Sequence, residues 1–198
     1  MNFIFDIGNV LVDFRPVFFL ESLFTDKHVV DKMNKTIFQS REWIDMDLGI
    51  ISHEQALEVF CGREPEYQAE IMLTMDRVTH MFTPYTDVIE LLPKIKGAGY
   101  GLYYLSNMHN ETRNFLIDEY DFFALFDGGV FSCDVNIIKP SSEIYHVFLA
   151  KYNLEAKNCM YFDDSVENIE AANEVGINGV LFTDVQSVQN KLRGFNIP

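Results

Sequence analysis

The sequence predicts an α/β protein: a Rossmann-like parallel sheet with helices on both faces, and a small all-helical cap inserted after the first strand. Five short runs predict the strands, because runs that are apolar almost throughout are typical of parallel strands covered on both faces. From residue 84 onward these runs alternate with segments of helical periodicity, which indicates βαβ units. Residues 16–80 contain no such run, and this gap predicts the cap.

The predicted strands are short, and most of them end beside polar residues or glycine. These strands are Asn2–Ile7, Tyr100–Leu105, Gly129–Ser132, Cys159–Phe162 and Gly179–Phe182. The helices predicted in the second part of the chain carry apolar residues at helical spacing. These helices are Thr86–Ala98, Asn110–Tyr120, Ser141–Tyr152 and Glu167–Val175. Gly176 directly follows the last of them, at a position typical of a C-cap.

The segment between the first strand and residue 81 has a different character. It is amphipathic and rich in Phe, Met, Asp and Glu. Ser52 and Gln55 form a capping-box pattern, which predicts that a helix begins there. We therefore predict that residues 1–15 and 81–198 form the Rossmann-like core and that residues 16–80 form the helical cap.

The composition predicts a globular, cytoplasmic protein and leaves a small anionic substrate possible. Hydrophobic residues make up 48% of the 198, too many for a disordered chain. The net charge of −15 disfavours nucleic acid and anionic membrane as partners, because both would repel the surface. Three widely spaced cysteines predict reduced thiols, and neither a basic signal-peptide region nor a membrane-spanning apolar stretch is visible.

Polar side chains stand where four of the predicted strands end or the loops after them begin. They are Asp6, Ser106 with Asn107, Lys139, and Asp163 with Asp164. In an open parallel sheet, ligands bind at the carboxyl ends of the strands. We therefore expect these side chains, although distant in sequence, to converge on one crevice.

In their order and spacing these residues resemble the four motifs of the haloacid dehalogenase-like hydrolase superfamily, over essentially the whole chain. The first motif of that family, a strand followed by DxDx(T/V), reads FDIGNV here; the second, a strand ending in Ser or Thr, reads YYLSN. The third, a Lys often followed by Pro, reads IIKPSSEIY; the fourth, an acidic pair, reads YFDDSVENIEAA. The insert after the first motif resembles a C1-type cap, and the DxGNV variant resembles α-glucose-1-phosphatase-like enzymes and the phosphatase domain of some epoxide hydrolases.

The resemblance implies that Asp6 is a nucleophile that attacks phosphorus and forms an aspartyl-phosphate. It also implies Mg²⁺, which reduces the repulsion between this carboxylate and an anionic phosphate. The implied ligands are the Asp6 carboxylate, the main-chain carbonyl of Gly8 and Asp164. Asp163 is expected to support these ligands without binding the ion directly, or to bind it through water.

The family pattern assigns the remaining motif residues to the phosphate. Ser106 and the main chain of Asn107 are expected to bind phosphoryl oxygens, and Lys139 to neutralise charge on the phosphate and hold the nucleophile. Substrate choice is expected to come from the cap, where Arg41 and Trp43 are candidates to contact the substrate. Glu42 and the turn Asp47-Leu48-Gly49 are further candidates to face the crevice.

Gly8 departs from the family pattern, because most phosphatases of the superfamily have Asp at this position as the general acid and base. Glycine cannot transfer a proton, and losing that step is worth about 10²–10⁴ in rate. Three explanations stay open. His109 or Asp13 substitutes; the substrate has a good leaving group, such as a sugar 1-phosphate; or the enzyme is weak.

The predicted function is therefore a Mg²⁺-dependent phosphomonoester hydrolase acting on a small phosphorylated metabolite. A 2-haloacid dehalogenase of the same superfamily is one alternative, since such enzymes also lack the acid two residues after the nucleophile. A catalytically weak phosphate-binding module is another. The sequence leaves the oligomeric state open.

Overall fold

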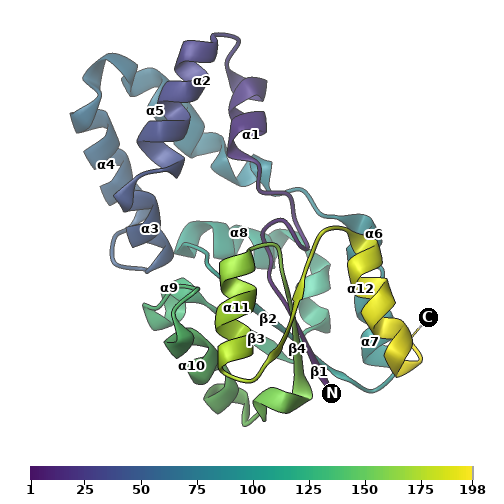
Figure 1. The fold of residues 1–198 in the computed structure, drawn as a ribbon. Coiled ribbons are helices and arrows are strands. Elements are labelled where there is room, and N and C mark those ends of the chain that lie inside the picture. Colours follow the sequence, from purple (N-terminus) through teal and green to yellow (C-terminus); the bar gives the residue numbers. More distant parts are fainter. Residues whose placement is uncertain (198) are drawn as a thin grey trace.

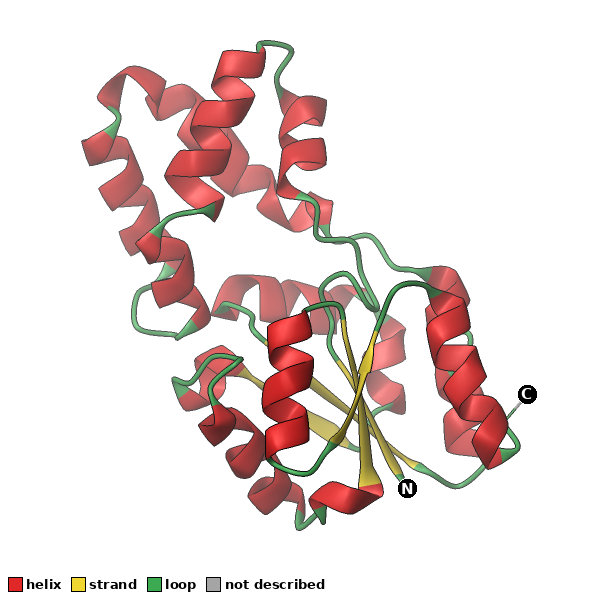
Figure 2. Ribbon diagram, in the orientation of Figure 1, coloured by secondary structure: helices red, strands yellow, loops and turns green. Residues whose placement is uncertain are grey.

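Five parallel strands form one sheet, in the spatial order β3-β2-β1-β4-β5. This computed structural model describes residues 1–197. The strands are β1 (Asn2–Phe5), β2 (Gly101–Ser106), β3 (Gly128–Phe131), β4 (Cys159–Asp163) and β5 (Asn178–Leu181). Figure 2 shows the strands surrounded by helices, which is the α/β architecture that the sequence predicts.

Helices cover both faces of the sheet, and the alternation of side chains along β1 explains how. Ile4 belongs to an apolar cluster that includes Phe148 of one flanking helix. Phe3 and Phe5 point to the other face and belong to a second cluster, with Ile95. The helices of the core are α6 (Thr86–Ile89), α7 (Leu92–Gly97), α8 (Asn110–Glu119), α9 (Ser132–Val135), α10 (Ser142–Tyr152), α11 (Val166–Glu174) and α12 (Val185–Leu192), with short turns η4 (Asp121–Leu125), η5 (Ala156–Asn158) and η6 (Arg193–Phe195).

The segment between β1 and α6 is helical, and we call it the helical insert (residues 16–80). Figure 1 shows its helices beyond the carboxyl ends of the strands, away from the flanking layers. It has buried apolar residues of its own, among them Leu20, Met33 and Phe60. Its elements are α1 (Pro16–Leu23), α2 (Lys27–Met33), η1 (Asn34–Phe38), α3 (Arg41–Asp47), α4 (His53–Arg63), η2 (Pro65–Tyr67), α5 (Gln68–Arg77) and η3 (Val78–Met81), the last of which reaches one residue beyond the insert.

Local sequence signals explain where several helices begin and end. The capping box is confirmed: the Gln55 N–H donates to Ser52 Oγ at 3.2 Å, and the Ser52 N–H donates to Gln55 Oε1 at 2.8 Å. The single helix predicted over Thr86–Ala98 is wrong, because the chain forms α6 and α7 instead. Pro93 lies in the first turn of α7 and has no N–H to continue a helix from α6.

Cys61, Cys133 and Cys159 are free thiols, as predicted. None of the helices within residues 1–197 is both long and apolar enough to cross a bilayer. The division into a core and a cap at residues 16 and 80 stays a prediction.

Candidate active site

The candidate site begins at Asp6, the residue that directly follows β1. The N–H of Asp6 donates to the carbonyl of Phe162 at 2.9 Å, which fixes its backbone to β4. The carboxylate accepts from the N–H of Ile7 at 2.7 Å, and only 7% of the residue is exposed. Burial raises the pKa of Asp6 to about 7, although the nearby Lys139 acts to lower it.

Lys139 places a buried positive charge beside this carboxylate. Its ammonium lies 2.9 Å from Oδ1 of Asp6 and 2.7 Å from Oδ2 of Asp163, and it donates to the hydroxyl of Tyr161 at 2.8 Å. Burial acts to lower the pKa of Lys139, but the two carboxylates outweigh it and raise the pKa above its ordinary value. The lysine therefore stays charged while it is enclosed by protein.

Asp163, the last residue of β4, orients this lysine. Its two carboxylate oxygens accept from the side-chain amide of Asn168 at 3.0 Å each, and Oδ1 also accepts from the N–H of Ser165 at 2.8 Å. The Tyr161 hydroxyl donates to Oδ2. Burial acts to raise the pKa of Asp163, but Lys139 and these donors lower it below the ordinary range. The oxygens of Asp163 are thus already engaged.

Asp164 lies next to this network and is more exposed. One oxygen each of Asp6, Asp163 and Asp164 lie within 4.8 Å of one another. The side chain of Asn9 holds Asp164 in this place, because its amide donates to Oδ2 of Asp164 at 3.0 Å. Asn9 itself has φ +54° and also accepts from the N–H of Phe14 at 3.0 Å. This left-handed turn after β1 is one that Asn tolerates better than most residues.

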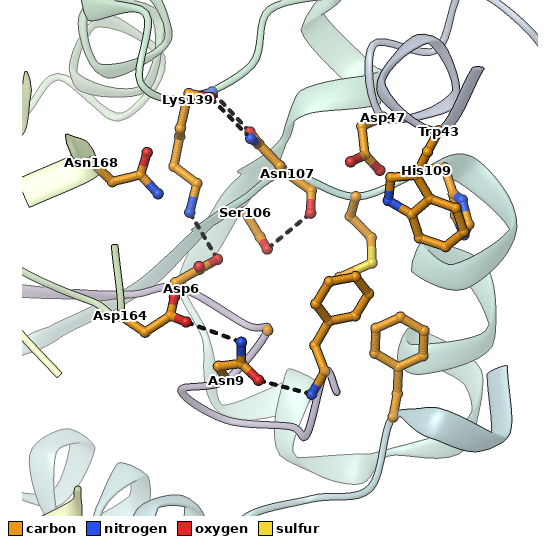
Figure 3. A pocket seen from close by; sticks show the side chains of 14 residues that line it. Asp6, Asn9, Trp43, Asp47, Ser106, Asn107, His109, Lys139, Asp164 and Asn168 are labelled. Atoms are coloured by element: carbon orange, nitrogen blue, oxygen red, sulfur yellow. Dashed lines mark hydrogen bonds and ion pairs between the residues drawn. The ribbon is translucent and has the colours of Figure 1, made fainter. Parts of the chain in front are cut away.

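The loops that follow β2 and β3 are joined beside Asp6. The amide of Asn107 accepts from the N–H of Lys139 at 2.8 Å and donates to the carbonyl of Lys139 at 3.1 Å. Ser106, the last residue of β2, is 1% exposed as a residue. The residues that follow β2 and the loop after α9 that carries Lys139 are therefore fixed relative to each other (Figure 3).

Asp6, Lys139, Asp164 and the residues after β2 line one pocket of about 300 Å³ between the sheet and the helical insert, whereas Asp163 is fully buried beneath it. One side carries the polar residues that follow the strands, as Figure 3 shows. The other side has an apolar wall of Phe14, Trp43, Phe82 and Met108, and Asp47 and His109 line the pocket beside this wall. The ring of Phe14 lies 5.7 Å from that of Phe82 and 6.2 Å from that of Trp43, so the aromatic wall is packed.

Residues 1–176 match the family model of the haloacid dehalogenase-like hydrolases. The chain belongs to this family. The match includes all four motifs, and one polar residue or more of each motif lines the pocket. The resemblance read from the sequence is thereby confirmed for the superfamily.

This haloacid dehalogenase-like hydrolase is similar to named phosphatases. The sesquiterpene phosphatase astK of Aspergillus oryzae is 28% identical over 190 residues, which cover 96% of this chain and 93% of the relative. Flavin mononucleotide hydrolase 1 of Arabidopsis thaliana is 22% identical over 78% of this chain and 62% of the relative.

Solved structures share the fold. The HAD family enzyme bt-2542 of Bacteroides thetaiotaomicron, in complex with magnesium and inorganic phosphate, is 18% identical, with a TM-score of 0.69 over 92% of this chain and 93% of that one. A dehalogenase with an intermediate complex is 16% identical, with a TM-score of 0.71 over 92% of this chain and 84% of that one. At these identities the likeness concerns the fold.

Two candidate substrate contacts from the insert have different surroundings. Trp43 lines the pocket, with its ring 5.0 Å from that of His109. Arg41 instead lies on the exposed side of α3, where its side chain is 69% exposed and forms an ion pair with Asp45 at 2.8 Å. Because the guanidinium faces solvent, we do not propose Arg41 as a substrate contact.

The two residues considered as substitutes for the missing acid are poorly suited to that role. Asp13 is buried and held by Arg15, whose Nε donates to both carboxylate oxygens at 2.7 and 2.9 Å. His109 lines the pocket, but its Nε2 is hydrogen-bonded to Thr112, and burial lowers its pKa to about 4. Its imidazole is therefore neutral near pH 7.

The sequence did not single out two residues that support the acidic pair. Asn9 supports Asp164, and Asn168 supports Asp163. Asp47, at the end of α3, lines the pocket from the insert side. The turn around Asp47 was visible in the sequence as a segment that could face the crevice, but nothing in the pattern distinguished its carboxylate from other acids of the insert.

Proposed function

We propose that this chain is a Mg²⁺-dependent phosphomonoester hydrolase that works through an aspartyl-phosphate on Asp6. One observation carries the proposal: the Asp6 carboxylate lies 2.9 Å from the buried ammonium of Lys139 and next to the carboxylate of Asp164. An anionic nucleophile reaches an anionic phosphate only where positive charge reduces the repulsion, and Lys139 supplies part of that charge. The similarity to named phosphatases supports the same function.

The donor set fits Mg²⁺, which prefers oxygen ligands and often uses one or two protein carboxylates. Asp6 and Asp164 would hold the ion, together with the main-chain carbonyl of Gly8. Asp163 would act through Lys139 or a bridging water, because its oxygens already accept several hydrogen bonds. When bound, the ion supplies positive charge to the phosphate and the nucleophile.

The proposed reaction has two steps. A carboxylate oxygen of Asp6 attacks phosphorus, the bond between phosphorus and the ester oxygen breaks, and the alcohol leaves with one proton. Water then attacks the phosphorus of the acyl phosphate, which releases inorganic phosphate and restores the carboxylate. The Ser106 hydroxyl and the main chain of Asn107 would bind the phosphoryl oxygens while Lys139 balances their charge.

The apolar wall supports an ester whose leaving group is apolar or aromatic. Apart from Asp47 and His109, this side of the pocket offers few polar partners to the several hydroxyl groups of a sugar, which would lose hydrogen bonds to water there. The relative that acts as a sesquiterpene phosphatase supports the same substrate class. The sugar 1-phosphate expected from the sequence stays a prediction, and we propose that the insert acts as the cap that makes this choice.

Phosphate release from a panel of esters tests the function. The panel contains glucose 1-phosphate, glucose 6-phosphate, p-nitrophenyl phosphate and a linear alkyl phosphate, each with Mg²⁺ and with EDTA. We expect Mg²⁺-dependent release that is lost in Asp6→Asn and retained in Asp45→Asn, whose carboxylate pairs with Arg41 outside the pocket. Faster turnover of the apolar esters supports the apolar pocket, and faster turnover of glucose 1-phosphate supports the sugar substrate.

Two outcomes would contradict a phosphatase. Chloride release from 2-chloropropionate without phosphate release would indicate a dehalogenase. Mg²⁺-dependent binding of inorganic phosphate without turnover of any ester would indicate a phosphate-binding module.

A further inference from the structure

The chemistry proposed above needs a proton at the leaving oxygen, and Gly8 cannot supply it. An alkoxide is a strong base, so an alkyl ester leaves slowly unless an acid protonates its oxygen as the bond breaks. The donor must reach the pocket beside Asp6 and carry a proton near neutral pH. His109 and Asp13 do not meet both conditions, for the reasons given above.

Asp47 meets the positional condition from the opposite side of the pocket. It is the last residue of α3, and its side chain lines the same pocket as Asp6, Ser106 and Lys139 (Figure 3). Its main-chain carbonyl is hydrogen-bonded, but no donor within residues 1–197 is hydrogen-bonded to its carboxylate. The carboxyl group is therefore available to a ligand.

Contacts with the core hold the turn that carries Asp47. The hydroxyl of Ser132 donates to the carbonyl of Asp47, and the amide of Asn136 donates to the carbonyl of Leu48 at 2.7 Å. Gly49 has φ +67°, and a Cβ there would lie 2.6 Å from the carbonyl oxygen of Cys133. The turn thus packs so closely on the core that only glycine fits at its tightest point.

The hydroxyl of Ser132 also connects this turn to the proposed phosphate-binding loop. It accepts from the N–H of Met108 at 2.9 Å, two residues after Ser106. One side chain therefore fixes the end of α3 relative to the loop that would bind the phosphoryl oxygens. Asp47 has the fixed position that a proton donor requires.

The electrostatic surroundings of Asp47 favour a carboxyl group that holds its proton near neutral pH. Burial raises the pKa of Asp47 to about 7; Lys139 acts to lower it and Asp6 acts to raise it. Cys133 also faces this carboxylate, and its own pKa is raised to about 11, so the thiol is neutral. A general acid works best when its pKa lies near the working pH.

We propose that Asp47 is the general acid of this site, supplied by the insert in place of the carboxylate that Gly8 lacks. The proposal rests on the proposed phosphatase function. As the bond between phosphorus and the ester oxygen breaks, the proton of the Asp47 carboxyl moves to that oxygen and the alcohol leaves neutral. The resulting carboxylate then takes a proton from the water that attacks the acyl phosphate, which restores the acid for the next turnover.

Leaving-group dependence tests the proposal on the full chain. Nitrophenolate is a weak base and leaves without a proton, whereas the alkoxide of a linear alkyl phosphate needs one. In Asp47→Asn we expect kcat/KM for the alkyl ester to fall about 10²–10⁴-fold. We expect kcat/KM for p-nitrophenyl phosphate to stay within about threefold, because this ratio reports the steps up to departure of the leaving group.

The same variant gives a second readout. Without Asp47 the acyl phosphate hydrolyses slowly, so we expect a burst of nitrophenolate close to one per enzyme, followed by a slow steady state. Equal losses of kcat/KM on both esters would overturn the proposal, since Asp47 would then only hold the pocket in shape. No loss on either ester would also overturn it.

A second variant tests whether Asp47→Asn loses alkyl phosphate turnover because a proton donor is missing. A Cβ at position 8 would have only Phe14 Cβ as a neighbour, at 3.6 Å, so the main chain there has room for the first atom of a side chain in Gly8→Asp. We expect Gly8→Asp combined with Asp47→Asn to regain at least tenfold in alkyl ester turnover over Asp47→Asn alone. The proposal would be contradicted if the double variant kept its kcat/KM for p-nitrophenyl phosphate but regained none of its kcat/KM for the alkyl phosphate.

Controls separate failure of this proposal from failure of the phosphatase function. Asp45→Asn, two residues away on α3 and outside the pocket, is expected to behave as wild type on both esters. If the wild-type chain releases no phosphate from either ester with Mg²⁺, the phosphatase function itself is wrong. If the wild-type chain is active and Asp47→Asn shows no leaving-group dependence, only the role of Asp47 is wrong.

Discussion

Removing the ammonium of Lys139 tests whether the buried charges of the site depend on one another. Lys139→Met keeps an unbranched apolar side chain but leaves the carboxylates of Asp6 and Asp163, at 2.9 and 2.7 Å, without their counter-charge. Removing one partner of a buried ion pair typically costs about 3–5 kcal/mol. We expect the free energy of unfolding to fall by about 3 kcal/mol. This is the low end of that range, because Asp163 keeps its hydrogen bonds from Ser165 and Asn168.

Arg41→Met is the matched control, because the ion pair of Arg41 has nearly the same length as that of Lys139 but is exposed to solvent. The distance from Arg41 to Asp45 is 2.8 Å, close to the 2.7 Å from Lys139 to Asp163. The Arg41 side chain is 69% exposed, however, whereas that of Lys139 is 2% exposed. An exposed pair at this helical spacing contributes about 0.3–0.5 kcal/mol. The two variants therefore separate the effect of burial from that of distance.

Urea unfolding followed by circular dichroism, with EDTA present to remove metal, measures both losses. With an m value of about 2 kcal/mol per molar urea, a loss of about 3 kcal/mol lowers the midpoint by about 1.5 M. We expect a shift of at most about 0.3 M for Arg41→Met. If the urea midpoints of the two variants shift equally within error, the reasoning is refuted, because burial would then add nothing to the contribution of an ion pair to stability.

Two further predictions concern the turns that position the site. Gly49→Ala places a methyl group in a left-handed turn against the carbonyl of Cys133. We expect the free energy of unfolding, measured with urea, to fall by about 1–3 kcal/mol. Gly97→Ala in α7, where a Cβ meets nothing within 4 Å, should leave stability unchanged or raise it, and equal losses in both would contradict the steric argument. Asn9→Ala removes the hydrogen bond that orients Asp164, and we expect Mg²⁺ affinity measured by calorimetry to fall about 10–100-fold. An unchanged affinity would show that Asp164 needs no such support.

Much of the fold and the polar half of the site could be predicted from sequence, because both follow from local pattern. Strands covered on both faces are apolar throughout, and the topology of a parallel sheet brings their carboxyl ends together. Asp6, Ser106, Lys139 and Asp164 therefore converge as expected, although their catalytic roles stay proposals. Pro93 was visible in the sequence as well, yet apolar periodicity alone predicted one helix where the chain forms two.

The sequence could name candidates in the insert but not decide which of them face the pocket, because that depends on tertiary packing. Arg41 and Asp47 lie on the same short helix, yet one faces solvent and the other faces the pocket. Ser132 and Asn136, residues of the core more than 80 positions further along the chain, hold the end of this helix at Asp47 and Leu48. Cytoplasmic location and the exclusion of nucleic acid rest on composition and stay predictions.

Trp43 and Asp47 stand one helical turn apart on α3, and both line the pocket. If Asp47 is the acid, a single turn of helix determines both the size of the group that the pocket admits and the basicity of the group that it releases. Mutational drift in this turn would then change substrate range and chemistry together. If the insert of a relative is grafted onto this core, the chimera is expected to take on both the substrate selectivity and the leaving-group reactivity of that relative.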